Sequence, residues 1–463
     1  MIIGLPADRA LRAGSIALAA AILLGAFPPG PVAATSATSP AASATTLAGA
    51  ASSIVPGRVD RTSFALVGRY SVSLGLRFDP GKIDVFTGID VRNASSGPID
   101  RLELNTIAAR VGQMRLGTVS VDGRRVPATV DDQTIVVPLG GILPPGASTF
   151  VRVHYSATLR RTLSGSDWLF AKANGIVDLY RWIPWLSLRR PFDRPNNGDP
   201  FLTVASPLVR VTIATDRPLV VAATGRRVAK QGLVQTFEAR DVRDMTITAS
   251  PFYRRTTTTV GSTTIQVYAK PGFPAATVRG YARTAIARMG ALAGAYPYAT
   301  YTIAQSAGGD GMESPELSWI PAGPTGSHLR WLVTHETAHQ WFYGLVGNDQ
   351  ARQPFADEAM ADELARYVTG IRRASRCPTG RLDRSIYAYS NACYFEVVYV
   401  QGSTFLDGLR KRMGNAAFWS AVRGYVAAHR LGIATTKQLL TALDDGTPLD
   451  LRPLLHTRFP SLF

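Results

Sequence analysis

The sequence predicts a multidomain protein in which an antiparallel β domain is followed by an α+β domain. Apolar residues alternate with polar or small residues between about positions 63 and 253, which is the period of half-buried strands. From about position 256 the apolar residues recur at helical spacing in several stretches. The length of 463 residues is enough for two or three domains with sizeable cores.

The first 34 residues have the features of a secretory signal segment. Arg9 and Arg12 precede an uncharged, mostly apolar stretch at positions 13–27, and small residues complete the segment. The apolar stretch is short for a membrane span, and an uncleaved anchor is the alternative interpretation. Positions 35–62 are rich in Ala, Ser and Thr without apolar periodicity, which predicts a linker. We therefore expect a secreted or extracytoplasmic protein, either free or associated with the cell surface.

The β domain is predicted to span residues 63–255. The alternation is clear, for example, in Val151, Val153 and Tyr155, and no long helical pattern interrupts it. Positions 179–201 contain two Trp with several Pro and Arg and are predicted to form an irregular insertion. This insertion either lines a cleft or forms a loop that its aromatic residues anchor.

The α+β domain is predicted to span residues 256–463. A strand at 263–269 opens it, and a helix with one apolar face follows and ends at Pro297. A second strand at 301–304 leads into a glycine-rich segment at 308–315. Later helices are predicted at 403–413, 416–429 and 436–442.

The motif His335-Glu336-Thr337-Ala338-His339 is the centre of the second domain. The apolar spacing around it predicts a helix through Phe342 that ends near Gly344. Residues i and i+4 share one face of a helix, so His335 and His339 can offer two imidazole nitrogens to one zinc ion. Glu336 lies beside that position, where it can accept a proton from a zinc-bound water and later donate it to a leaving amine.

A catalytic zinc ion takes a third protein ligand and keeps one position for water. The pattern at positions 356–368 predicts a helix, and Glu358 near its start is the candidate ligand. Glu363 is the second choice, because its spacing from His339 fits no known pattern, and it is interpreted as a solvated or salt-bridged residue. The sequence therefore predicts one zinc ion per chain, held by His335, His339 and Glu358.

These residues, together with three longer segments, resemble the aminopeptidase N and leukotriene hydrolase-like family of zinc gluzincin metallopeptidases. The segments occur in the order that the family has, and the resemblance covers roughly residues 64–463. Gly311-Met312-Glu313-Ser314-Pro315 is similar to the family's Gly-Ala-Met-Glu-Asn pattern. His339-Gln340-Trp341-Phe342 is similar to its H-Q-W-F pattern, and Tyr399-Val400-Gln401-Gly402-Ser403 is similar to its Tyr-x-Lys-Gly-Ala pattern.

The resemblance implies both a fold and an activity. The fold is a saddle-shaped amino-terminal β-sandwich packed against a thermolysin-like α+β domain that carries the zinc site. The activity is that of a zinc aminopeptidase, which hydrolyses amino-terminal residues from peptides. Many family members carry a further large helical domain that closes over the site. This chain ends before such a domain, and we expect a more open cleft.

The resemblance also implies the catalytic roles. Glu336 is the general base, and the hydroxyl of Tyr399 donates a hydrogen bond to the oxyanion of the tetrahedral intermediate. Tyr399 precedes a Gly-Ser start to a helix, as in the family, although Gln401 stands where the family has Lys. Three other tyrosines are close in sequence and compete for the role: Tyr387, Tyr389 and Tyr394.

By the same resemblance, Glu313 binds the positive α-amine of the substrate, which a carboxylate at a fixed distance from zinc selects. The backbone of Gly311 and Met312 is expected to hold the peptide extended. This chain departs from the family pattern at Ser314, where Asn is usual. Glu316 competes with Glu313 for the same role.

Side chains outside the ligand set are expected to orient the two histidines of the motif. The sequence does not choose among four polar residues that are close to the ligands: Asn348, Asp349, Asp357 and Asp362. The other four histidines have no ligand spacing and are interpreted as structural or surface residues: His154, His328, His429 and His456.

Cys377 and Cys393 are the only cysteines, and in an exported chain we expect them to form a disulfide. Closing a loop of about 15 residues contributes about 3 kcal/mol on the chain-entropy model. The formal charge of +17 favours contact with an anionic cell envelope or with acidic peptides. The basic residues are dispersed and no nucleic-acid motif occurs, so no nucleic-acid partner is predicted. The sequence does not indicate an oligomeric state.

Two alternatives to an aminopeptidase remain open at this point. One is a zinc endopeptidase of the same fold, because an open cleft admits longer chains. The other is a catalytically weak protein that binds the cell envelope through its β domain. The altered loop around Glu313 favours the second alternative. It is opposed by the intact set of site residues, which consists of His335, Glu336, His339, Glu358 and Tyr399.

Overall fold

The structure is a computed structural model, and it describes residues 53–189 and 202–463. These residues belong to one compact unit that runs from Gly49 to Phe463. The predicted signal segment at 1–34 and residues 35–52 of the predicted linker lie outside the described residues. Within the described ranges, no helix combines the length and the apolar character that a membrane crossing requires.

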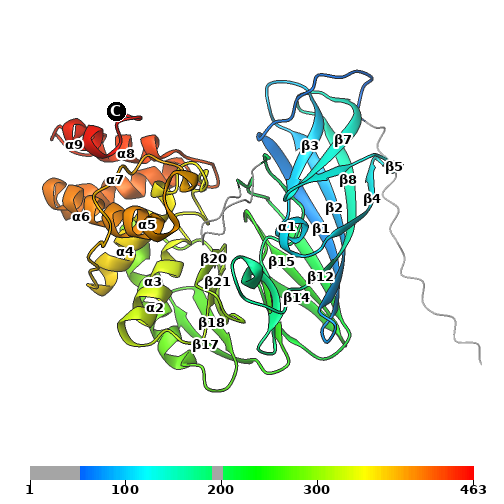
Figure 1. Cartoon of the computed structure of the whole chain (residues 1–463), viewed down its shortest axis with the longest axis horizontal. Coiled ribbons are helices and arrows are strands. Elements are labelled where there is room, and N and C mark those ends of the chain that lie inside the picture. Colours follow the sequence, from blue (N-terminus) through cyan, green and yellow to red (C-terminus); the bar gives the residue numbers. More distant parts are fainter. Residues whose placement is uncertain (1–52, 190–201) are drawn as a thin grey trace, which may run out of the picture. The chain divides into compact units, whose positions relative to one another are not determined.

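In the described residues, sixteen strands precede the second region and form three sheets (blue to green in Figure 1). The largest sheet has eight strands in the order β14-β15-β12-β1-β2-β8-β4-β5. Two four-stranded sheets have the orders β13-β16-β10-β9 and β11-β3-β7-β6. The bounds are β1 Leu66–Arg77, β2 Lys82–Asn93, β3 Ile99–Asn105, β4 Arg115–Val121, β5 Arg124–Arg125, β6 Thr129–Asp131, β7 Thr134–Leu143, β8 Ser148–Thr158, β9 Phe170–Ala173, β10 Ile176–Leu179, β11 Trp185–Leu186, β12 Val209–Thr215, β13 Val220–Ala223, β14 Arg226–Gln231, β15 Val234–Ala239 and β16 Ile247–Ser250.

The alternation that predicted these strands corresponds to their burial. Along β1 every second side chain is buried, and β2 and β8 repeat the pattern. Val151, Val153 and Tyr155, for example, are all at most 1% exposed. The only helical turns in this part of the described chain are the short α1 (Ile107–Val111) and a 3₁₀ turn at Asp167–Leu169. The predicted β architecture is therefore confirmed.

One part of the prediction was wrong, because the β domain is not purely antiparallel. Strand β1 pairs with β12 in parallel, with Tyr70 opposite Val209 and Leu76 opposite Thr215. The long chain segment between these strands can cross from one end of the sheet to the other, as a parallel pair requires. Alternation alone cannot reveal strand direction, since it reports only which face of each strand is buried.

The described part of the predicted insertion, up to residue 189, anchors itself in the β core. Trp182 is fully buried and its indole N–H donates to the carbonyl of Met245 at 2.9 Å. Trp185 stacks on Tyr70 with ring centroids 4.2 Å apart. Of the two interpretations of this segment, the aromatic anchor describes residues 179–189; residues 190–201 lie outside the described ranges.

A five-stranded mixed sheet begins the second region, in the order β17-β18-β19-β21-β20. Strand β20 is its edge strand and pairs only with β21 within the described chain. The predicted domain boundary at 255–256 falls inside β17, which pairs along its whole length with β18. The bounds are β17 Arg254–Val260, β18 Thr263–Ala269, β19 Thr300–Gln305, β20 Met312–Ser314 and β21 Leu317–Ile320.

Helices make up most of the remaining chain (yellow-green to red in Figure 1). Their apolar sides and the five-stranded sheet share a second hydrophobic core. The bounds are α2 Ala275–Ala293, α3 Gly326–Ala338, α4 Met360–Thr369, α5 Asn391–Phe395, α6 Gly402–Met413, α7 Asn415–Ala428, α8 Thr436–Asp445 and α9 Arg452–Arg458. Two π-helical turns, Phe355–Ala359 and Glu396–Gln401, directly precede α4 and α6.

The predicted disulfide is present and joins Cys377 to Cys393, whose Cα atoms are 5.8 Å apart. The loop that it closes is further fixed by Gln401, whose amide N–H groups donate to the carbonyls of Cys377 and Pro378. The side chain of Gln401 therefore points to the disulfide loop and is not part of the metal site.

Candidate active site

Helix α3 carries both histidines of the motif. The predicted helix through Phe342 is wrong at its end, because α3 stops at Ala338 and His339 is its C-cap. His339 keeps right-handed helical angles (φ −62°, ψ −10°), and its N–H still donates to the carbonyl of His335. The i, i+4 spacing therefore survives although the backbone turns away directly afterwards, with Gly344 donating to the carbonyl of His339.

Glu358 lies in the π-helical turn that precedes α4. Such a turn accommodates one more residue than an α-helical turn and is frequent at functional sites. Gly402, at the start of α6, contacts this turn so closely that an added Cβ would lie 2.7 Å from the Cβ of Ala359. A glycine at position 402 thus allows α6 to approach the ligand-bearing turn.

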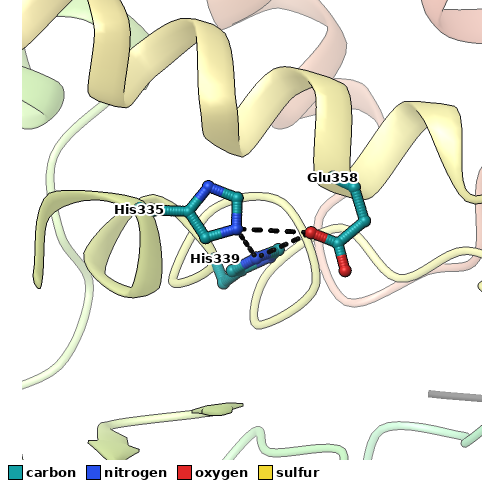
Figure 2. Close-up of side chains that lie close together, drawn as sticks. All are labelled: His335, His339 and Glu358. Carbon is teal, nitrogen blue, oxygen red and sulfur yellow. Dashed lines mark hydrogen bonds and ion pairs between the residues drawn. The ribbon is translucent and has the colours of Figure 1, made fainter. Parts of the chain in front are cut away.

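The three predicted ligands converge on one point. Figure 2 shows their side chains directed toward each other, joined by dashed lines. The Nε2 atoms of His335 and His339 are 3.1 Å apart, and Oε2 of Glu358 is 3.3 Å from the first and 3.4 Å from the second. A tetrahedral ion with ligand bonds of about 2.0–2.1 Å places its ligand atoms about 3.3–3.4 Å apart, so the triangle has the dimensions of a zinc site.

The chemistry of the donors also fits a cation. All three residues are buried, and Oε2 of Glu358 makes no hydrogen bond within the described chain. Burial would raise the pKa of Glu358, but the imidazoles of His339 and His335 outweigh it and hold the pKa well below its ordinary value. The glutamate is therefore an anion that faces two nitrogen donors, as in a site with two histidines and one glutamate.

The second-choice ligand Glu363 lies elsewhere. It is fully buried, and its Oε1 accepts a hydrogen bond from Nε of Arg410 at 3.0 Å. Burial raises the pKa of Glu363 to about 8 despite this arginine. The expectation of a salt-bridged residue agrees with this contact, whereas a solvated side chain does not.

The structure selects among the candidates for orienting the histidines. Oδ1 of Asp357 lies 2.7 Å from Nδ1 of His339, so this carboxylate accepts the ring N–H and leaves Nε2 for the metal position. Asp362 lies 3.8 Å from Nδ1 of His335, which makes no hydrogen bond within the described chain. The other two candidates have different partners: Asn348 donates to the carbonyl of Gln353, and Asp349 accepts from the N–H of Arg352.

Glu336 lies against the glycine of the predicted exopeptidase loop. A Cβ added to Gly311 would come within 2.2 Å of the Glu336 carboxylate, so any larger residue at this position would displace that carboxylate. Burial raises the pKa of Glu336 well above its ordinary value, and Glu313 and Glu358 add to this rise against the effect of His339. A carboxyl group with a raised pKa is suited to exchange protons near neutral pH.

Tyr399 lies beside the ligands, in the second π-helical turn. Its ring stacks on His335 with centroids 5.5 Å apart, and it lines one pocket together with the ligands and Glu336. Burial raises the pKa of Tyr399 well above its ordinary value, so the hydroxyl keeps its proton and can donate it in a hydrogen bond. Of the competing tyrosines, Tyr389 donates to the carbonyl of Arg381, and Tyr394 packs against the ring of Tyr399.

Glu313 and Gly311 line the same pocket, and Met312 begins the edge strand β20. Glu313 is only 6% exposed, and its Oε1 accepts a hydrogen bond from Nε2 of Gln350 at 3.1 Å. The competitor Glu316 does not line this pocket; its carboxylate accepts from the hydroxyl of Thr300 at 3.1 Å. The structure thus places Glu313, and not Glu316, at the site.

Sequence reasoning missed three residues near the ligands. Gln350 contacts both Glu313 and Asp357, and Trp331 and Phe395 line the pocket. Trp331 and Phe395 each precede a predicted site residue by one helical turn, a spacing that could have placed them on the same face. Nothing in the sequence marks Gln350, since its contacts bridge separate elements.

None of the four histidines outside the motif belongs to a group of side chains that could hold a metal in the described chain. Nε2 of His154 is paired with Asp84 at 2.8 Å, and Nδ1 of His456 lies 2.6 Å from the carbonyl of Phe463. His328 stacks on Trp331, and His429 packs against Tyr425.

Comparison with solved structures identifies the fold. The chain matches the crystal structure of M1 zinc metallopeptidase from Deinococcus radiodurans with a TM-score of 0.66 and 21% identity, covering 88% of this chain and 95% of that one. A glutamate-to-alanine mutant of that peptidase bound to a Tyr-Ser-Ala substrate matches with a TM-score of 0.65 and 20% identity, covering 88% and 96%. A two-domain mutant bound to L-tryptophan matches with a TM-score of 0.65 and 21% identity over the same shares.

The fold is therefore that of the two-domain M1 zinc metallopeptidases, as the motifs in the sequence implied. No protein-family model and no curated protein matches the sequence. At this identity the likeness concerns the fold, and the chemistry of this chain has to be argued from its own residues.

Proposed function

We propose that this protein is a zinc metallopeptidase of the aminopeptidase type. The observation that carries the proposal is the convergence of three ligand atoms, from His335, His339 and Glu358, in a pocket that also contains Glu336 and Glu313. The triangle of ligand atoms matches zinc in size and donor type. An adhesion protein would not need this buried arrangement of ionisable groups.

Each residue of the pocket has a role in peptide hydrolysis. Zinc, when bound, polarises the scissile carbonyl and lowers the pKa of a water molecule. Glu336 accepts the proton of the attacking water and delivers it to the leaving amine. Tyr399, which stays protonated because it is buried, donates a hydrogen bond to the oxygen on which negative charge develops. Asp357 holds His339 in the tautomer that presents Nε2.

The preference for the amino-terminal peptide bond is argued from Glu313 and strand β20. An edge strand has free backbone groups that can pair with an extended peptide. Glu313 lies in the centre of that strand and lines the ligand pocket. A peptide paired with β20 can therefore place its charged α-amine on Glu313 and its first peptide bond at the ligands. Related folds have been solved with a Tyr-Ser-Ala substrate and with L-arginine, which supports peptides as substrates.

We further propose export to an extracytoplasmic location. The signal pattern at residues 1–34 supports it, and so does the disulfide between Cys377 and Cys393, since such bonds persist in oxidising compartments. The charge of +17 is suited to association with an anionic envelope. Cell fractionation with sequencing of the mature amino terminus tests this; intact residues 1–34 in the cytoplasm would contradict it.

The function is tested with peptides that carry either a free or an acetylated amino terminus. We expect cleavage of the free-amine peptides only, lost on addition of a chelator and in Glu336→Gln. Glu313→Gln should raise KM for free-amine peptides, whereas Glu316→Gln, in the turn that follows β20 and outside the pocket, should not. Efficient cleavage of acetylated peptides would indicate an endopeptidase instead. A purified chain that binds no zinc would exclude both.

A further inference from the structure

Gln350 lies in the segment between α3 and the turn that carries Glu358, and it belongs neither to the ligands nor to the pocket lining. Its side chain is buried, with 4% exposed. The amide nitrogen Nε2 donates to Oε1 of Glu313 at 3.1 Å and also to Oδ2 of Asp357. One primary amide therefore connects two carboxylates that have different proposed roles.

The chemistry of the two neighbours fixes the orientation of this amide. Ionised carboxylates only accept hydrogen bonds, so the NH₂ group and not the carbonyl oxygen must face them. Oε1 of Gln350 accordingly makes no hydrogen bond within the described chain. The two N–H groups of one amide then serve one acceptor each.

The connection continues to the metal site. Asp357 uses its other oxygen, Oδ1, to hold Nδ1 of His339 at 2.7 Å. One carboxylate oxygen of Glu313, one of Asp357 and a ring nitrogen of His339 all lie within 4.8 Å of one another. The two carboxylates are close enough to repel, and the amide of Gln350 together with the ring N–H of His339 supplies the donors that keep them together.

We propose that Gln350 is a positioning residue that couples the amine-binding carboxylate of Glu313 to the zinc ligand His339 through Asp357. The inference rests on the proposed function. Its consequence is that one side chain, which touches neither metal nor substrate, sets both the affinity for zinc and the affinity for a free α-amine.

Two substitutions remove the bridge in different ways. Gln350→Met keeps the length of the side chain and removes both donors. Gln350→Glu keeps the shape and adds a third carboxylate beside the other two, so its effects should be larger. Gln353→Met is the matched control: Gln353 lies in the same segment, and its Oε1 accepts from the N–H of Thr436 without touching the site.

The readouts are binding constants, not turnover. Zinc affinity is measured by competition with a chromophoric chelator. Affinity for L-tryptophan is measured by calorimetry on the zinc-saturated protein, with N-acetyl-L-tryptophan as the reference without a free amine. We expect Gln350→Met to weaken zinc about tenfold, in the range found for groups that support metal ligands, and to weaken L-tryptophan by a similar factor. The control should change neither, and the affinity for N-acetyl-L-tryptophan should stay the same.

The coupling predicts a further result that a loss of packing would not produce. Glu313→Gln should weaken only L-tryptophan, and Gln350→Met in that background should weaken L-tryptophan no further. Additive losses, or unchanged affinities in Gln350→Met while the unaltered chain binds both ligands, would overturn the coupling alone. If the unaltered chain binds no zinc or no L-tryptophan, the proposed function fails and the coupling fails with it.

Discussion

The Nε2 atoms of His335 and His339 face the same point, but their Nδ1 atoms have different surroundings. Nδ1 of His339 is held by Asp357 at 2.7 Å and lies 3.0 Å from the carbonyl of Phe342. Nδ1 of His335 has its nearest carboxylate, Asp362, at 3.8 Å. Hydrogen bonds thus fix one ring, and the other is fixed mainly by packing.

The packing around His335 is aromatic. Trp331 lies with its ring centroid 5.1 Å from that of His335, and Tyr399 lies at 5.5 Å. Asp362 is already occupied by the indole N–H of Trp331, by Arg373 and by the hydroxyl of Ser403. Two equivalent histidines are thus oriented by different interactions, hydrogen bonds for His339 and aromatic packing for His335, so that mutations can affect one without the other.

The largest effect is expected at Glu358, which lies against both His335 and His339. Glu358→Gln replaces the anionic ligand that faces both histidines by a neutral amide. Zinc affinity should fall by well over the roughly 100-fold that the loss of a supporting group can cost, and activity should fall with it. Metal content after dialysis measures this directly. Stoichiometric zinc in the dialysed variant would show that Glu358 is not a ligand.

Tyr399→Phe separates the two roles of the tyrosine on the His335 side. The ring remains to pack against His335, whereas the hydroxyl that we propose stabilises the oxyanion is lost. We expect kcat to fall about 10²–10³-fold, as for removal of one oxyanion donor, with zinc affinity unchanged. Steady-state kinetics and a zinc titration on the same preparation test the separation. If the variant kept its full kcat, another group would have to donate the hydrogen bond to the oxyanion, and Tyr394 would be tested next.

Asp357→Asn weakens the side that depends on hydrogen bonds. The amide cannot accept the N–H of His339 with the strength of a carboxylate, and zinc affinity should fall about 10–100-fold. Competition titration with a chelator gives the number. Because the substitution is nearly isosteric, thermal unfolding should show whether the fold is retained, and a loss of fold in place of a loss of zinc would contradict the assignment.

Asp362→Asn is the matching change on the other side. Since Asp362 does not hydrogen-bond His335, zinc affinity should change less than in Asp357→Asn, by under about tenfold. Stability should suffer instead, because Arg373 and the indole of Trp331 lose a charged acceptor, at a cost of about 1–3 kcal/mol. Equal losses of zinc in the two variants would break the distinction between the two sides.

The smallest effect at the site is expected from the disulfide. Replacing Cys377 and Cys393 by Ser should lower the free energy of unfolding by about 3 kcal/mol, because the unfolded chain regains the entropy of an open loop of about 15 residues. The ligand triangle does not include this loop. Zinc affinity at 25 °C should be unchanged while Tm falls, and a parallel loss of zinc would show that the loop supports the Tyr399 turn.

Much of the fold was predictable because burial leaves a periodic trace in the sequence. The strand at 263–269 coincides with β18, and the β domain was identified from alternation alone. The periodicity does not predict features that hydrogen bonds determine, such as the end of a helix or the direction of a strand. The apolar spacing extended the motif helix through Phe342, four residues beyond the end of α3 at Ala338, and it gave no sign of the parallel pair of β1 and β12.

The atoms that can bind a metal follow from the sequence. His335 and His339 are four residues apart, and helical geometry, a property of the local chain, brings them to one face. Glu358 was identified from its position near the start of a predicted helix, and Glu313 from the resemblance of a short segment to the family pattern.

Which neighbours support those atoms becomes clear only in the folded chain. Asp357 was one of four equal candidates, and Gln350 was not a candidate at all, because side chains from separate elements meet only after the chain has packed. The resemblance had already favoured Tyr399 and Glu313, and the structure separates them from their competitors, since a π-helical turn and an edge strand place these two side chains in the ligand pocket. Local geometry follows from sequence spacing, whereas long-range contacts depend on the packing of the whole chain.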